Sequence, residues 1–307
     1  MTSARYPLPT DIVALVSFDG RVYPNEAKPL DQLGIDKPAH PLETALEQWF
    51  SFATGQQTWV SVRGATIRGL ISARRRAKRS AWEVEVLIDA SDDESVVLSL
   101  FSRLTAGVIR QGAERVFLRL ESASPLVQVA RSAGFFLYGR ETLYRREAAP
   151  RAAPPDLPLR RREDADQPGI YQMYTRAVPA TVRSIEGATF REWQAAQERW
   201  GRCTDLVLDG DGVIGGWVRA QAGQVGRIQV LALEGAAPYE ELARAALALV
   251  KNRPVFCLAS DHNAGLISAL RGLDFEPVAT YTAMAKRLAR PVGEMVTETA
   301  GTAVPAN

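Results

Sequence analysis

Apolar positions along the chain fall into two series of elements that follow one order. In the first series, three segments of alternating apolar residues predict strands, and apolar side chains spaced by three or four residues over 93–110 predict a helix lying on a sheet. A strand, a short helix and a closing strand complete the series. The predicted elements are strands 59–62, 67–73 and 82–88, helix 93–110, strand 115–120, helix 125–132 and strand 141–146.

The same order returns after residue 200. A strand pair, a third strand, an amphipathic helix, a buried strand, a short helix and a closing strand are again predicted, at 205–210, 213–220, 227–233, 239–251, 254–260, 263–271 and 281–288. Identical residues occupy matching positions, because Arg131 and Phe135 correspond in register to Arg271 and Phe275. We interpret the two series as a duplicated unit.

A proline-rich stretch separates the two series. Residues 147–158 read EAAPRAAPPDLP, with four prolines and no apolar periodicity, which predicts an extended linker. A length of 307 residues also fits two domains better than one. The expected organisation is an N-terminal domain 1–148, a linker 149–158, a C-terminal domain 159–290 and a flexible tail 291–307.

Composition and charge narrow the class of protein. No uncharged apolar run reaches the ~18 residues of a membrane helix, and the first residues lack the apolar core of a signal peptide, so we expect a cytoplasmic protein without a membrane partner. The net charge of +2 is spread evenly along the chain, which argues against nucleic acid as a partner. The exception is a group of five cations within 74–79. We interpret this group as a solvated hairpin turn, with a polyanion site as the alternative.

Cysteine and histidine are scarce. Cys203 and Cys257 are far apart in the sequence, so neither a disulfide framework nor a zinc site is expected, and Cys257 in the run VFCLA is predicted to lie in a core. The two histidines, His40 and His262, are too few for a histidine-rich metal centre. The sequence therefore predicts no metal.

The order of elements resembles the GNAT superfamily of N-acetyltransferases. The resemblance covers about 59–147 and 205–288, and it rests on the order hairpin, strand, long helix, strand, short helix, Gly-Phe, strand. It implies an α/β fold of two tandem domains, each with a mixed, mostly antiparallel sheet flanked by helices. The preceding segments would supply a first strand and two opening helices, with apolar anchors at Trp49, Phe50, Phe190 and Trp193.

The resemblance also implies acetyl-CoA as a co-substrate, whose pyrophosphate lies on backbone amides of a glycine-containing loop after the fourth strand. In the first series this loop reads Asp89 to Glu94, with four carboxylates that would repel pyrophosphate. In the second series the small residues of this loop would let the pyrophosphate approach the backbone closely, although Pro238 has no amide hydrogen to donate. The residues expected to hold acetyl-CoA are Leu231, Leu233, Gly235, Ala236, Ala237 and Asn263.

Candidate catalytic residues follow from the same resemblance. Glu85 is the carboxylate at the position of the family's general base, with an exposed position facing arginines across the hairpin as the alternative. The family's tyrosine acid is missing from both series. His262 is a substitute acid or base, with a solvated loop residue as the alternative. For Asn263 the alternative to a cofactor contact is a helix N-cap.

These features predict an acyl-CoA-dependent N-acyltransferase that acts on a small-molecule or peptide amine. The rival prediction is a non-catalytic scaffold or regulatory protein with the same fold that has lost acetyl-CoA binding in one or both domains. A polyanion binder that uses the cations at 74–79 is a third alternative. The sequence does not decide whether the protein forms a homodimer.

Overall fold

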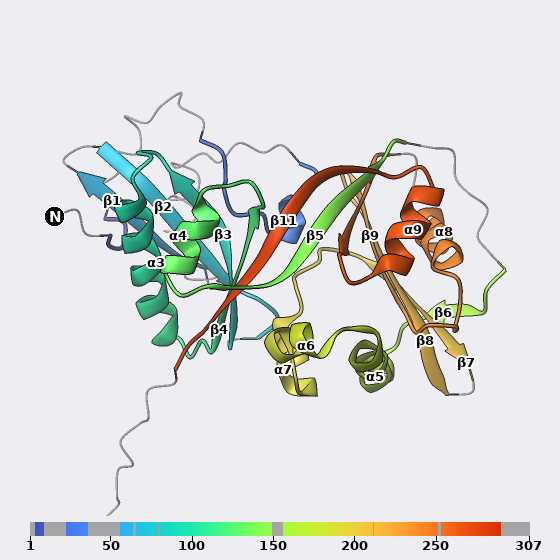
Figure 1. Ribbon diagram of the computed structural model, residues 1–307. Coiled ribbons are helices and arrows are strands. Elements are labelled where there is room, and N and C mark those ends of the chain that lie inside the picture. Colours follow the sequence, from blue (N-terminus) through green and yellow to red (C-terminus); the bar gives the residue numbers. More distant parts are fainter. Residues whose placement is uncertain are drawn as a thin grey trace, which may run out of the picture.

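The two series fold as two units whose strands join in one continuous sheet (Figure 1). The computed structural model describes residues 4–8, 23–35, 56–63, 66–78, 80–148, 156–210, 212–250 and 253–289. Most of the predicted linker, the tail, His40, Trp49, Phe50 and Arg79 lie outside the described residues.

The first unit follows the predicted order closely. Asp93 caps its long helix by accepting a hydrogen bond from the Ser95 amide at 3.0 Å, and the apolar face of that helix is buried against the sheet. The elements are β1 (Gln56–Arg63), β2 (Thr66–Arg75), β3 (Ala81–Asp89), α3 (Glu94–Ile109), β4 (Arg115–Glu121), α4 (Leu126–Ser132) and β5 (Phe136–Arg146).

The second unit repeats this order after a short first strand and a group of opening helices. The described chain has three short α-helices there rather than the two expected, and Trp193 is buried in the third of them. The elements are β6 (Leu159–Arg161), α5 (Gln167–Ala177), α6 (Ala180–Glu186), α7 (Phe190–Ala196), β7 (Thr204–Gly210), β8 (Val213–Ala222), β9 (Gly226–Ala232), α8 (Tyr239–Leu249), β10 (Val255–Ser260), α9 (Ala264–Gly272) and β11 (Glu276–Arg287).

The turn after the short helix is alike in the two units. Phe135 and Phe275 are buried to 2% and 3% exposure, and each follows a residue with positive φ. That residue is Gly134 at φ 87° in the first unit and Asp274 at φ 59° in the second. The matching backbone supports the alignment of the two series.

The closing strands are exchanged between the units, which the sequence analysis did not predict. The order in the sheet is β1-β2-β3-β4-β11-β5-β10-β9-β8-β7-β6. The last strand of the first unit, β5, pairs antiparallel with β10, and the last strand of the second unit, β11, pairs antiparallel with β4. The two closing strands also pair with each other and lie side by side at the centre of the molecule (Figure 1).

Apolar residues form a core on the helical face of each unit. One cluster joins α3 and α4 to the first four strands, and a second joins α8 and α9 to β8, β9 and β10 and includes the predicted core residue Cys257 at 1% exposure. Helices α5 and α7 cover the opposite face of the second unit. In the described part of the chain, none of the helices combines the length and the apolar character that crossing a membrane requires.

The domain boundary at 149–158 stays a prediction, and the strand exchange sharpens its test. A protease that cuts in this proline-rich stretch should leave two fragments that migrate together on native size exclusion, because β5 and β11 each belong to the sheet of the other half. They should separate only in denaturant. Two fragments that separate without denaturant would contradict the exchange.

Candidate functional site

A cleft is expected in each unit where two parallel strands diverge. Pairing of β3 with β4 ends at Glu83 and Phe117, although both strands continue. Pairing of β9 with β10 likewise ends at Ile228 and Cys257. Beyond these points the facing strand edges offer backbone groups that the parallel ladder does not use.

In the first unit a segment of the chain itself fills this opening. We call residues 23–35 the inserted segment. The Asn25 side chain accepts from the Leu87 amide at 2.9 Å and donates to the Glu85 carbonyl at 2.8 Å, while the Glu26 amide donates to the Leu87 carbonyl at 2.9 Å. The inserted segment thus occupies the exposed edge of β3.

The inserted segment bonds to β4 as well. The Lys28 amide donates to the Arg119 carbonyl at 2.9 Å, and the Arg119 guanidinium donates to the Lys28 carbonyl at 3.0 Å. Ala27, between these contacts, is fully buried. The cleft of the first unit is therefore closed by an extended backbone that bridges its two diverging strands.

The same segment is held by the second unit. Arg227 of β9 donates to the carbonyls of Asp31 and Leu33 at 2.7 and 3.0 Å. Gly34 has φ 74°, and a Cβ at this position would lie 2.6 Å from the Phe256 ring of β10, so only glycine fits. These contacts fix the inserted segment between the two units.

In the second unit the cleft remains open. A cavity of about 180 Å³ lies against the diverging ends of β9 and β10, between the two units. Its residues come from both units because β5 of the first unit is the neighbour of β10, with Glu141 opposite Ser260. Its lining includes Arg76, Arg119, Glu141, Tyr174, Glu186, Trp193, Glu198, Trp200, Trp217, Leu231, Leu258, Ser260, His262 and Asn263.

The structure brings three predicted site residues to this cavity, namely Leu231, His262 and Asn263. Asn263 also caps α9, because its side chain accepts from the Leu266 amide at 3.1 Å, so the N-cap interpretation is confirmed. Partial burial lowers the pKa of His262, with Glu141 and Asp261 opposing the shift. The imidazole is therefore neutral at neutral pH.

The loop after β9 holds the other predicted cofactor residues, outside the cavity lining. Gly235 has φ 80°, and a Cβ placed on it would meet nothing within 4 Å, so this face of the loop is accessible. The Ala236 amide is already used, since it donates to the Leu233 carbonyl at 3.1 Å. Ala237 packs at the edge of the second core.

Glu85 lies in the first unit, away from the open cleft. Its carboxylate accepts from Arg74 across the β2–β3 hairpin at 2.9 Å, which agrees with the alternative of an arginine facing it. Its side chain is 18% exposed and Glu83 beside it is 4% exposed, so the expected solvent exposure of this face was wrong.

Two residues that the sequence analysis missed face the cavity together. Glu186 ends α6, and its carboxylate accepts a hydrogen bond from the Tyr174 hydroxyl of α5 at 3.1 Å. Burial, reinforced by the nearby charge of Glu141, raises the pKa of Glu186 to about 7. Burial and Glu186 likewise raise the pKa of Tyr174, which therefore stays protonated and donates.

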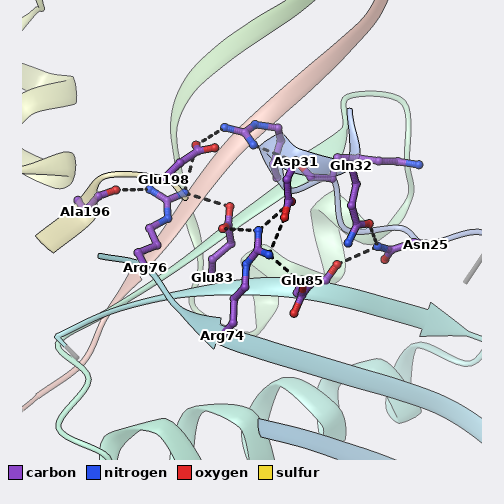
Figure 2. Close-up of polar contacts among 11 residues, drawn as sticks. Asn25, Asp31, Gln32, Arg74, Arg76, Glu83, Glu85, Ala196 and Glu198 are labelled. Carbon is purple, nitrogen blue, oxygen red and sulfur yellow. Dashed lines mark hydrogen bonds and ion pairs between the residues drawn. The ribbon is translucent and has the colours of Figure 1, made fainter. Parts of the chain in front are cut away.

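A buried network of charges borders the cavity on the side of the first unit (Figure 2). Arg74 and Arg76 are 9% and 5% exposed, so the interpretation of the cations at 74–79 as a solvated turn was wrong for these two residues. Arg74 pairs with Asp31 at 2.7 Å, and Arg76 donates to the Ala196 carbonyl at 2.9 Å. These ion pairs and hydrogen bonds leave neither side chain free for a polyanion.

The network runs on through Glu198, in the loop after α7. This carboxylate binds Arg76 at 3.4 Å and Arg119 at 2.6 Å, and Arg119 also binds Glu141 at 2.7 Å. Burial opposes ionisation of Glu198, but the two guanidinium groups outweigh it and lower its pKa. The network therefore ties both units to the wall of the cavity.

Removing one member of this network should be costly. Arg76→Met should lower the free energy of unfolding by about 3–5 kcal/mol, because the buried carboxylates of Glu83 and Glu198 would lose the cation that they share and the Ala196 carbonyl would lose its donor. Chemical denaturation measures the change. Arg103→Met, at an exposed position of α3, is the control and should change stability by no more than about 0.5 kcal/mol. Equal effects of the two substitutions would contradict the assignment.

Comparison with known proteins identifies the fold. No family model matches the chain, and no curated protein matches it by sequence. The crystal structure of a GCN5-related N-acetyltransferase from Sphaerobacter thermophilus aligns with a TM-score of 0.58 and 16% identity, over 92% of this chain and 95% of that chain. A protein from Pyrococcus horikoshii, provisionally assigned as an acetyltransferase, aligns with a TM-score of 0.51 and 14% identity, over 93% of this chain and 89% of that chain.

Proposed function

Because the chain has the fold of the GCN5-related N-acetyltransferases, we propose that it is an acyl-CoA-dependent N-acyltransferase whose active half is the second unit. The observation that carries the proposal is the open cleft between β9 and β10, into which Glu186 brings a carboxyl with a pKa of about 7. A general base is most effective when its pKa lies near the working pH.

The filled cleft of the first unit indicates what kind of molecule would fit the open cleft of the second unit. There, an extended chain bonds to the amide and carbonyl of Leu87, and Val230, beside Leu231, is the matching residue of the second unit, since both Leu87 and Val230 face the helical core. The pantetheine arm of acetyl-CoA is also an extended chain with amides. The Leu233 amide donates to the Gly215 carbonyl of β8 at 2.8 Å, so Leu231 and Leu233 direct their backbone groups toward β8. We infer that the Val230 backbone faces this arm, with Leu231 and Leu233 beside it, and that Gly235, Ala236 and Ala237 adjoin the pyrophosphate, with Asn263 at the far wall.

The chemistry needs a proton acceptor beside the amine. The acyl-CoA supplies a thioester whose sulfur leaves as a thiolate. Glu186 accepts one proton from the ammonium form of the acceptor, so that the neutral nitrogen can bond to the carbonyl carbon as the carbon–sulfur bond breaks. The nitrogen then loses a second proton, and the thiolate takes one up. Tyr174 positions the carboxylate throughout by donating to it.

The earlier candidates take lesser roles in this proposal. His262 is a second proton carrier at the cavity wall. Glu85 is held by Arg74 beside the closed cleft, where no acyl group reaches it. The scaffold alternative has no specific observation in its favour in the second unit, although the closed cleft fits it for the first unit.

The cofactor proposal predicts one acetyl-CoA per chain. In calorimetry on the full-length protein, Gly235→Asp should weaken binding by at least about tenfold, because it sets a negative charge beside the pyrophosphate. Ser91→Asp adds a charge to the corresponding loop of the first unit and should leave the affinity unaltered. No binding at millimolar ligand would support the scaffold alternative, and two sites per chain would contradict the closed cleft.

The base proposal predicts a paired effect of Glu186→Gln. The value of kcat/KM should fall by about 100-fold or more, and the rise of the wild-type rate with pH through about 7 should disappear. Assays across pH with acetyl-CoA and an amine panel measure both. Glu276→Gln, at an exposed position of β11, is the control and should behave as the wild type.

The stability of the same variant checks the pKa independently. Because the folded pKa lies above the ordinary value of 4.5, ionising Glu186 destabilises the native state as pH rises from 4.5 to about 7. Glu186→Gln should therefore be more stable than the wild type above pH 7, by up to about 3 kcal/mol, and should match it near pH 4. A constant difference across this range would mean that Glu186 has an ordinary pKa.

A further inference from the structure

The cavity in the second unit has an aromatic inner wall. Tyr174, Trp193 and Trp217 line it with exposures of 6%, 7% and 5%, and Trp200 reaches it from the loop after α7. The wall is fixed by packing, since the ring centroids of Tyr174 and Trp193 are 6.0 Å apart. Flat rings held in this way offer a surface to another flat apolar group and to a cation.

The charges around the cavity do not balance. Arg119 lies between Glu141 and Glu198, and Arg76 lies between Glu198 and Glu83. Glu186 adds a further carboxyl, and in the described part of the chain no cation comes within ion-pair distance of it. A second acceptor is also unused, because the Oε2 atom of Glu198 is buried without a hydrogen-bond partner. The cavity therefore offers oxygen acceptors to a donor from outside the protein.

We propose that the acceptor is a monocationic amine with a flat aromatic body and no carboxylate beside its nitrogen, bound with its ammonium group at Glu186 and its ring against Trp193 and Trp217. This inference rests on the proposed acyltransferase function and deepens it. The ammonium supplies the donor that the carboxyl oxygens lack, and the apolar wall selects the body of the molecule. An α-carboxylate would meet Glu141, Glu186 and Glu198 in the same small space.

Binding of such a cation depends on the ionisation of Glu186. The groups that face this carboxyl are Tyr174 of α5, Glu141 and Tyr138 of β5, Arg76 after β2 and Glu198 after α7. Of these, Arg76, Glu198 and Glu141 are held in ion pairs. The affinity for the amine should accordingly rise with pH through about 7, as Glu186 loses its proton.

Binding of 2-phenylethylamine to the full-length protein, without acyl-CoA, tests the inference. Calorimetry near pH 8, or tryptophan fluorescence, should give an affinity at least about tenfold higher than for phenylalanine, which adds only the carboxylate, or for butylamine, which lacks the ring. Glu186→Gln and Trp200→Leu should each weaken binding of 2-phenylethylamine by about tenfold. Glu276→Gln should leave it unchanged.

The inference about the acceptor amine can be wrong while the proposed acyltransferase function still holds. Equal binding of phenylalanine and 2-phenylethylamine would overturn the inference, as would unchanged binding by Glu186→Gln or no binding of any of the three amines. The wild-type comparison of ligands needs no variant, so it stands even if a substitution impairs folding. Acetyl-CoA binding, measured separately, decides the proposed function.

Discussion

The pairing of the two closing strands is the constraint on which the rest of the structure depends. Each unit completes its sheet with the last strand of the other, so β5 and β11 lie side by side at the centre and the strands of both halves form one sheet. Glu141 reaches the open cleft because β5 is the neighbour of β10. The first unit is thus a structural part of the site that we assign to the second.

The two units share one architecture, but the cleft between the diverging strands is filled in the first unit and open in the second. In the first unit the backbone groups of the diverging strands are satisfied by the inserted segment, with the carboxamide of Asn25 taking the place of a peptide group. In the second unit the matching strands border a cavity. A buried polar strand edge must find partners, and in the second unit the Tyr239 hydroxyl supplies them only at Ala232, where it bonds to the amide and the carbonyl.

The sequence predicted what is local. Periodicity placed the strands and helices of the repeated series within about five residues, because burial of one face repeats along each element, but it did not place β6, α5, α6 or α7. It could not predict that β11 pairs with β4, because the hydrophobic pattern of a strand does not specify which strand it pairs with. The burial of Arg76 could not be predicted either, because it lies in a group of five cations that resembles a solvated turn. Only the fold brings Glu83, Glu198 and the Ala196 carbonyl around its guanidinium. Tyr174 and Glu186 carry no motif, and they meet only because α5 and α6 pack together.

The exchange of strands also has a consequence for biosynthesis. The edge of β4 is synthesised well before its partner β11, residues 276–287, which follows the other strands of the second unit. Until then the first unit exposes an unpaired strand flanked by apolar residues, the kind of edge that associates with other chains. Contacts between such distant parts of the sequence slow folding. The emerging chain therefore leaves this edge open to association with other chains until β11 has been made.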